Sequence, residues 1–314
     1  MREEETTVPL VSICCITYNH EAFLAQAIES VLKQQTDFAV ELVIGEDCSP
    51  DGTRQIALDY QSRYPGQVRV LLPEKNLGIM RNLMTTMAAC TGRYVAFLEG
   101  DDYFTDPHKL QRQVDVMRAQ PDCTLCIHDA EVFWQDNSAP AYLFSTKYAT
   151  LLPAHEARIT QADLVEYGWG IPSASMVFRR DSILPLPEWF QGVFSGDYTL
   201  QLLSTRRGYI YWLPQVMSRY RLHAGGVMQT SSNTLGQNEK RIFELEHYKH
   251  FLPQQLHAKV DEYLEYLYLE RSEKMAALGK RGQQLRYYLK AMTINRQRLG
   301  FHLRRLVKRV TLSA

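Results

Sequence analysis

Three carboxylate side chains follow one short apolar segment of this chain. Residues 94–98 are Tyr-Val-Ala-Phe-Leu, and Glu99, Asp101 and Asp102 come directly after them. Such a run is typical of a buried strand in a parallel sheet, and ligands of open α/β sheets bind at the carboxyl ends of strands. Acids crowded there repel one another and lose hydration, and a divalent cation relieves both costs. Because oxygen ligands suit Mg²⁺ or Mn²⁺, the cluster predicts a metal site for a phosphorylated substrate, expected to be a nucleotide.

Two other strand ends supply polar groups that could reach the same crevice. Thr17, Tyr18 and Asn19 end a first apolar segment, and Glu46 and Asp47 end a second. The carboxyl ends of parallel strands meet at one edge of the sheet, so we expect a nucleobase between these two ends. Its diphosphate would then run toward the acids. Asp47 would accept a hydrogen bond from the base or ribose, with turn chemistry as the alternative interpretation.

Strands and helices alternate in the part of the chain that must position these groups. Hydrophobic periodicity and turn residues predict strands at 10–17, 40–46, 68–72 and 94–98 and helices at about 20–33, 53–64, 79–90 and 107–119. This order predicts an α/β fold with a mainly parallel sheet, flanked by helices and joined by right-handed crossovers.

The second half of the chain is less regular. We expect a strand over 123–134, an irregular stretch over 136–160, a strand near 172–179, a helix near 196–206 and an aromatic segment at 209–213. From about residue 235 the pattern is helical almost throughout. The predicted division is a catalytic domain over 1–230 and a C-terminal helical region over 231–314.

Four motifs in this order resemble a known family. They are Val11-Ser-Ile with Thr17-Tyr-Asn19, Glu46-Asp with Asp51-Gly-Thr53, Asn76-x-Gly78 with Arg81-Asn82, and Leu98-Glu-Gly-Asp-Asp102. Together they resemble a family 2 glycosyltransferase of the Rossmann-like GT-A fold. The resemblance covers about residues 8–226, and its motifs have the order and spacing of that family.

The resemblance implies roles for the strand-end residues. Thr17, Tyr18, Asn19, Glu46 and Asp47 would line the nucleotide, and Tyr18, Asn19 and Asp47 would surround the base. Arg81 would reach the nucleotide, Asp101 would contact the ribose, and Asp102 would bind the metal, Mn²⁺ or Mg²⁺. Many members have Asp where this chain has Glu99, so we expect Glu99 to support the metal ligands rather than bind the cation itself.

The resemblance also implies a base and a closing segment in the second half. Family members carry an Asp at the head of a helix, often preceded by Glu; here Gly196 stands before Asp197. Asp197 would remove the acceptor hydroxyl proton during an in-line, inverting displacement; capping its own helix is the alternative interpretation. In Arg219-Tyr-Arg-x-His223, Arg221 would pair with the diphosphate and His223 would bind the metal or diphosphate.

The predicted function is inverting, metal-dependent transfer of a sugar from a nucleoside diphosphate sugar. The family's commonest usage implies a UDP-sugar, and the acceptor would be a saccharide or lipid-linked saccharide, as in bacterial surface polysaccharide synthesis. One alternative is a metal-dependent nucleotidyltransferase, although the chain has no P-loop and no second carboxylate cluster. The other is a non-catalytic module that binds a nucleotide or glycan.

Charge is unevenly distributed along the chain. The net charge is zero, but residues 274–314 contain eleven Lys or Arg and no acid, so the other residues carry 24 basic and 35 acidic side chains. Residues 280–314 predict a basic amphipathic helix that could bind an anionic membrane, pair with a helix of a second copy, or dock on the chain's own acidic domain. Its apolar positions are Leu285, Leu289, Met292, Leu299, Leu303, Leu306 and Val310.

The expected location is cytoplasmic, with a peripheral position at the inner face of the membrane if the basic helix binds lipid. No apolar run reaches the roughly 18 residues needed to cross a bilayer, and the first seven residues are polar and acidic, unlike a signal peptide. We expect no nucleic-acid partner.

Overall fold

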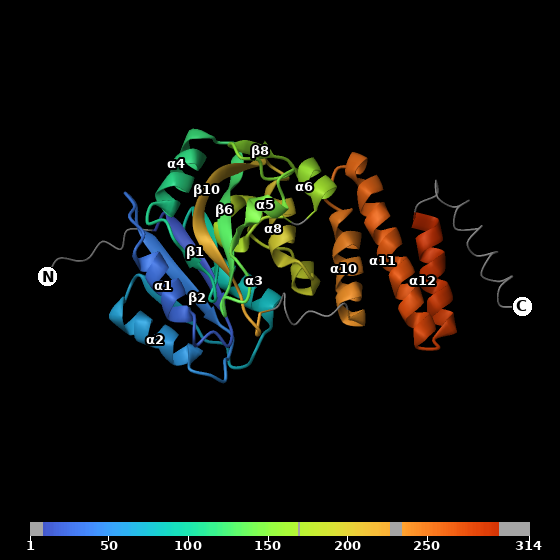
Figure 1. Cartoon of the computed structure of the whole chain (residues 1–314), viewed down its shortest axis with the longest axis horizontal. Helices are drawn as coiled ribbons and strands as arrows, with labels where there is room; N and C mark the ends of the chain where they lie inside the picture. Colours follow the sequence, from blue (N-terminus) through green and yellow to red (C-terminus); the bar gives the residue numbers. More distant parts are fainter. Residues whose placement is uncertain (1–8, 169, 227–233, 295–314) are drawn as a thin grey trace, which may run out of the picture. The chain divides into compact units, whose positions relative to one another are not determined.

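The chain divides into two compact units. The computed structural model describes residues 9–168, 170–226 and 234–294. One unit comprises residues 1–191 and 196–230, and the other comprises residues 192–195 and 231–314. The first holds the β-sheet with its flanking helices, and the second is helical (Figure 1).

The first unit begins with the predicted alternation of strands and helices. Its elements are β1 Val11–Thr17, α1 Leu24–Leu32, β2 Val40–Glu46, α2 Thr53–Arg63, β3 Val68–Leu71, α3 Ile79–Ala89 and β4 Tyr94–Glu99. β1 pairs in parallel with β2 and β4, and β2 pairs in parallel with β3. The carboxyl ends of β1, β2 and β4 therefore lie at one edge, as expected.

The second half of this unit extends the sheet with strands of both directions. Its elements are β5 Tyr103–Phe104, α4 Lys109–Ala119, β6 Cys123–Trp134, β7 Tyr142–Leu143, α5 Phe144–Lys147, β8 Ala157–Ile159, α6 Gln161–Tyr167, the 3₁₀ helix Ser173–Ser175, β9 Val177–Arg179, α7 Arg180–Ile183, the 3₁₀ helix Glu188–Gly192, α8 Gly196–Ser204 and β10 Tyr209–Leu222. The strand order is β3-β2-β1-β4-β9-β6-β10-β5, with β7 on β6 and β8 on β10.

The sheet is mixed and mostly parallel, because β9 runs antiparallel between β4 and β6 whereas β10 runs parallel to β6. Two expectations for the second half were wrong. The stretch 136–160, expected to be irregular, contains the short elements β7, α5 and β8, and the strand expected near 172–179 is only the three residues of β9, which follow the 3₁₀ helix Ser173–Ser175. The aromatic segment at 209–213 is the start of the 14-residue strand β10.

Helices cover both faces of the sheet. Val11, Ile13 and Cys15 of β1 alternate along the strand and pack in one buried cluster with side chains of α1, α2 and α4. Full burial of each aliphatic side chain contributes about 1.5–3 kcal/mol. On the other face, a Cβ at Gly45 would lie 2.0 Å from Thr86 Oγ1, so only a glycine lets α3 approach β2 this closely.

The second unit consists of α10 Leu235–Tyr248, the 3₁₀ helix Gln254–Leu256, α11 His257–Ala277 and α12 Arg281–Ile294. α10 begins with a capping box in which Thr234 and Gln237 exchange hydrogen bonds. α11 packs against both α10 and α12. The expectation of a helical C-terminal region is thus confirmed for the described residues.

A four-residue segment that lies earlier in the sequence, 192–195, belongs to this helical unit. Glu244 of α10 is 6% exposed, and its Oε2 accepts hydrogen bonds from the backbone N–H groups of Phe194 and Ser195, each at 2.9 Å. A Cβ at Gly192 would lie 2.7 Å from the Phe243 ring. The next residue of the chain, Gly196, begins α8 of the first unit.

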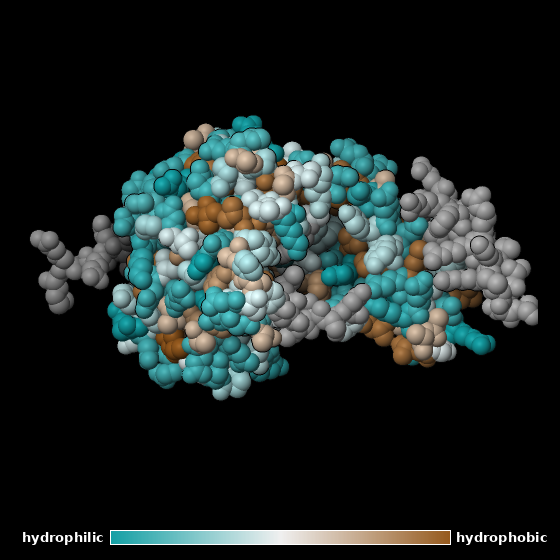
Figure 2. Space-filling view, in the orientation of Figure 1, coloured by the Kyte–Doolittle hydropathy of each residue, from teal (hydrophilic) through white to brown (hydrophobic). Residues whose placement is uncertain are grey.

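The surface seen in Figure 2 is mostly hydrophilic, with hydrophobic residues in small, separate patches. Among the described helices, none combines the length and apolar character needed to span a membrane. On α12, Leu285 and Leu289 are 55% and 49% exposed, whereas Met292 is buried. The other apolar positions predicted for the basic helix, from Leu299 to Val310, lie outside the described residues.

Candidate functional site

The end of β1 presents an exposed aromatic ring. Thr17 is buried as the last residue of β1, and the next side chain, Tyr18, is 43% exposed. Asn19 then adopts φ 56°, in the left-handed region, and its N–H donates to Ser49 Oγ at 3.0 Å. This turn holds Tyr18 beside the loop after β2, as a residue stacking on a nucleobase would require.

The two acids at the end of β2 are bound by protein groups. Glu46 is fully buried and accepts from Ser49 N–H and from Arg54 Nε, both at 2.6 Å. Asp47 is 3% exposed and accepts from the N–H groups of Leu77 and Gly78, at 2.7 and 2.9 Å. Both carboxylates therefore fix the loops around the crevice, and a direct contact with a nucleotide stays a prediction for each.

Arg81 lies in the first turns of α3, exposed to solvent. Its Nε donates to Gln191 Oε1 at 2.9 Å. A guanidinium that donates one hydrogen bond through Nε still has the N–H groups of its two Nη atoms to donate to an anion. Its predicted contact with the nucleotide is compatible with this placement.

The acid-bearing loop after β4 packs directly on the end of β1. A Cβ at Gly100 would lie 2.5 Å from Thr17 Oγ1 and 3.0 Å from His20 Nδ1, so this position leaves no room for a larger residue. The three acids around Gly100 differ in their partners. Glu99 Oε2 accepts from Ser173 Oγ at 2.7 Å, and Asp102 Oδ1 accepts from the backbone N–H of Arg221 at 2.8 Å.

The environments of the acids shift their pKa values in different directions. Burial and then the charge of Asp101 raise the pKa of Glu99 to about 8, against the Ser173 hydrogen bond. Burial and the charges of Asp101 and Glu99 raise the pKa of Asp102 well above its usual range. Burial opposes ionisation of Asp101 too, but the hydrogen bond from His223 and the nearby His20 lower its pKa. Without a cation, Asp101 is thus the acid of this cluster that the protein keeps ionised.

Arg221 is enclosed by its neighbours rather than open to a ligand. It is 7% exposed, and its Nε donates to the Asp101 carbonyl at 2.7 Å and its Nη2 to Gln26 Oε1 at 2.7 Å. Its guanidinium also lies 4.7 Å from the centre of the Phe23 ring. The predicted pairing with a diphosphate is therefore not favoured; the contacts make Arg221 a support for the loop that carries Asp101 and Asp102.

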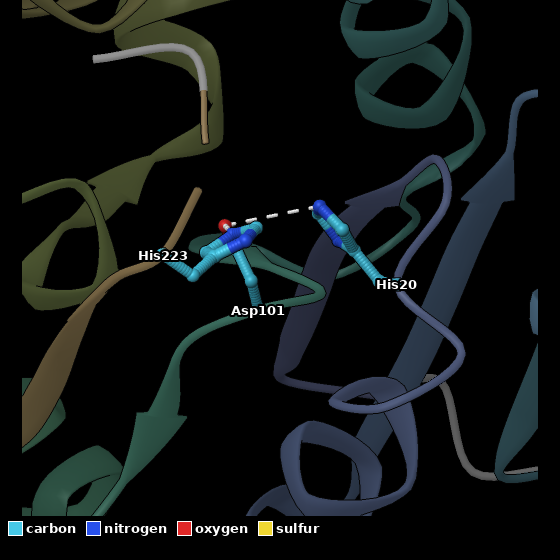
Figure 3. A group of neighbouring side chains, drawn as sticks. All are labelled: His20, Asp101 and His223. Carbon is cyan, nitrogen blue, oxygen red and sulfur yellow. Dashed lines mark hydrogen bonds and ion pairs between the residues drawn. The ribbon is translucent and has the colours of Figure 1, made fainter. Parts of the chain in front are cut away.

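Two imidazoles and one carboxylate meet at this edge of the sheet (Figure 3). Asp101 Oδ2 lies 3.1 Å from Nε2 of His223 and 3.8 Å from Nε2 of His20. These ligand atoms all lie within 4.8 Å of one another. The grouping differs from the predicted pair of metal ligands, because His223 lies with Asp101, which was expected to contact ribose, rather than with Asp102.

The residues at this edge fit a divalent cation. Two nitrogens and a carboxylate oxygen are ordinary ligands for one. Asp102 Oδ2 and Thr17 Oγ1 are also buried without a hydrogen-bond partner among the described residues. An unpaired buried polar atom costs about 1–3 kcal/mol, so such atoms at a strand edge indicate a place where a ligand completes the structure. The predicted role of Asp102 in metal binding stays a prediction.

Asp197 lies in the first turn of α8, partly buried. Its charge contributes to the raised pKa of Glu99, after burial and the charge of Asp101. A Cβ at Gly196 would lie 2.7 Å from Met80 Sδ. A larger residue at this position would therefore require the flexible Met80 side chain to move.

His20 is the site residue that the sequence analysis did not single out. A single histidine in a loop forms no motif with nearby residues that would indicate metal binding. Its partners Asp101 and His223 are 81 and 203 residues away in the sequence. The available signal was its position, directly after Tyr18 and Asn19 at the end of a strand that had already been assigned to the crevice.

Sequence comparisons place this chain among glycosyltransferases. A family profile described as Glycosyl transferase family 2 matches residues 12–181. An uncharacterized protein of Mycobacterium tuberculosis is 33% identical over 222 residues, which are 70% of this chain and 61% of that protein. A Bacillus subtilis protein named for teichuronic acid biosynthesis, TuaG, is 35% identical over 35% of this chain and 42% of its own length. The chain thus spans about three-fifths of the mycobacterial relative.

Solved structures show the same fold at low sequence identity. Staphylococcus aureus TarS, residues 1–349 in complex with UDP-GlcNAc, superimposes with a TM-score of 0.67 and 16% identity, over 90% of this chain and 81% of that one. The mannosyltransferase PcManGT of Pyrobaculum calidifontis, in complex with GDP-Man and Mn²⁺, has a TM-score of 0.56 and 16% identity, over 91% and 76%. With the profile matching more than half of its residues, the chain belongs to glycosyl transferase family 2.

Proposed function

We propose that this protein transfers a sugar, with inversion, from a nucleoside diphosphate sugar to a saccharide or lipid-linked saccharide. The observation that carries the proposal is the meeting of Asp101 and His223 with His20 at the sheet edge where β1, β4 and β10 end. Two further observations support it: Tyr18 directly follows β1, and the charge of Asp197 acts on Glu99 at the end of β4. The UDP-GlcNAc and GDP-Man complexes of the two structural relatives support a nucleotide sugar as the donor class. A UDP-sugar is the proposed donor, in line with the TarS complex.

In the proposed reaction, Asp197 accepts the proton of the acceptor hydroxyl while that oxygen attacks the anomeric carbon. The base must act from the face opposite the leaving diphosphate. Tyr18 would stack on the base, and Arg81 would pair with the nucleotide. Asp101, Asp102 and His223 would hold a divalent cation, which when bound stabilises the charge that develops on the leaving diphosphate.

Asp197→Asn is the variant that tests this assignment. Losing a general base typically lowers turnover about 10²–10⁴-fold, whereas binding of the donor should be nearly unchanged. Asp163→Asn is the matched control, because Asp163 lies in the first turn of α6 and its role there is a capping box with Thr160. Full turnover by Asp197→Asn would show that the proposed base is wrong.

Thermal melting with a panel of nucleoside diphosphates, with and without Mn²⁺, tests the donor. A ligand at about 100 times its Kd stabilises the folded state by roughly 2.7 kcal/mol. We expect stabilisation by UDP that requires Mn²⁺. Donor binding without any transfer by the native protein would instead support a binding module.

We further propose that the acceptor is reached at an anionic membrane surface and belongs to surface polysaccharide synthesis, as the name of TuaG does for that relative. Leu285 and Leu289 are exposed on α12, and no acid follows Glu273. Such a face can lie in the headgroup region of anionic lipids. Flotation with phosphatidylglycerol vesicles should weaken in the Leu285→Gln/Leu289→Gln double variant, and unchanged flotation would discard the idea.

A further inference from the structure

His20 reaches the candidate metal site from a different segment of the chain than the acids after β4 do. It lies in the turn between β1 and α1, whereas Asp101 follows β4 and His223 follows β10, and Figure 3 shows the three side chains turned toward one another. Its Nε2 is 3.8 Å from Asp101 Oδ2. The distance is longer than a hydrogen bond, so this ring is not held in place by Asp101.

Contacts on other sides set the position of the His20 ring. The backbone N–H of His20 donates to Thr53 Oγ1 at 2.8 Å. The ring lies edge-on to the His223 ring, with centroids 6.1 Å apart, and near Phe23, at 6.3 Å. Gly100 passes close to Nδ1 on the remaining side. These contacts enclose the ring and hold it with Nε2 toward the Asp101 carboxylate.

We propose that His20 is a further protein ligand of the cation, and that His20, Asp101 and His223 bind a transition-metal ion such as Mn²⁺ before the nucleotide arrives. This inference rests on the proposed function and adds a binding order to it. A cation held by one or two carboxylates usually needs substrate phosphates to complete its ligands. Three protein ligands supply enough contacts to hold the ion in their absence, and two imidazoles favour transition metals over Mg²⁺.

Titration of the full chain with MnCl2, after chelator treatment and without nucleotide, tests the proposal. Calorimetry or electron paramagnetic resonance of free Mn²⁺ should show one equivalent bound by the native protein, more tightly than Mg²⁺. His20→Gln should weaken this binding by at least about tenfold, the lower range for disturbing a metal's ligand environment. His108→Gln, an exposed histidine of the same unit, should bind as the native protein does.

The outcomes separate this inference from the proposed function. Equal Mn²⁺ affinity in His20→Gln and the native protein, at unchanged melting temperature, would overturn the role of His20. A native protein that binds Mn²⁺ only with UDP present would overturn the binding order. If Mn²⁺ binds alone but no nucleoside diphosphate binds with it, the inference stands and the proposed function fails. If His20→Gln loses UDP affinity but keeps Mn²⁺ affinity, His20 contacts the nucleotide instead.

Discussion

Replacing Lys109 with methionine should change how the stability of the fold depends on pH. Lys109 begins α4 and is fully buried; its Nζ donates to Gln113 Oε1 at 2.9 Å and lies 4.1 Å from the centre of the Phe104 ring. Burial lowers the pKa of this amine from 10.5 to about 7, although Cys126 opposes the shift. His128 on β6 also faces it, and burial followed by the charge of Lys109 lowers the pKa of that ring well below its usual value.

The sign follows from which state binds more protons. Between about pH 7 and 10.5 the folded protein has a neutral Lys109 while the unfolded chain is still protonated there, so stability rises with pH. At about 1.36 kcal/mol per pKa unit, the shift corresponds to roughly 4–5 kcal/mol at pH 7. Lys109→Met removes this cost but leaves Gln113 Oε1 without its donor, which offsets roughly 1–3 kcal/mol. A net stabilisation of roughly 2 kcal/mol is expected at pH 7, shrinking as the pH rises.

Urea unfolding at pH 7.0, 7.5, 8.0 and 8.5 measures the effect. The range ends below pH 9.0, the ordinary pKa of the thiols of Cys15 and Cys126, which burial raises in the folded protein. Above that pH these thiols would ionise in the unfolded chain only, and the stability of the fold would then fall with pH. The difference between Lys109→Met and the native protein should fall by about 1–2 kcal/mol across the range. Lys75→Met, at an exposed site, should show no such change. A constant difference between Lys109→Met and the native protein would refute the reasoning.

Two other substitutions test the supports of the site. Gly100→Ala should lower the free energy of unfolding by about 1–3 kcal/mol and weaken Mn²⁺ binding, because the added Cβ would collide with Thr17 and crowd His20. Urea unfolding and metal titration measure both effects, with Gly282→Ala as the control. A native Mn²⁺ affinity in Gly100→Ala would contradict the prediction. Glu244→Leu should lower kcat by about 10- to 100-fold with little change in donor affinity, since the segment before the proposed base loses its acceptor. Glu244→Gln should keep most of the rate, because its amide oxygen can still accept the hydrogen bonds from Phe194 and Ser195. Equal rates in Glu244→Leu and Glu244→Gln would contradict the role of these hydrogen bonds.

The first four strands could be predicted from sequence because each is an apolar run bounded by turn residues. β10 could not, since Pro214 and polar residues interrupt its pattern. The structure shows why the strand continues: its register with β6 shifts between Leu213 and Val216, and an irregularity of this kind accommodates a proline. The antiparallel insertion of β9 between β4 and β6 depends on contacts between distant segments, which no local pattern records.

The candidate site, like the fold, could be predicted from the sequence only in part. The acids after β4 and the polar ends of β1 and β2 could be predicted because parallel strands place their carboxyl ends together. The partners of each side chain could not. Arg221 is charged and follows a family motif, yet it is enclosed by Gln26 and Phe23, which are almost two hundred residues earlier. His20 joins Asp101 and His223 only once the sheet has formed.

The return of residues 192–195 to the helical unit has a consequence for recombination of this chain with its relatives. A crossover at residue 230 would exchange α10 but leave behind residues 192–195, of which Phe194 and Ser195 donate to Glu244 and Gly192 lies against Phe243. A chimaera made this way would place a foreign helix against a segment that ends two residues before Asp197 and whose contacts are with the native α10. Productive exchanges should therefore carry residues 192–195 and the helical region together, so that the segment before the proposed base Asp197 keeps its partners on α10.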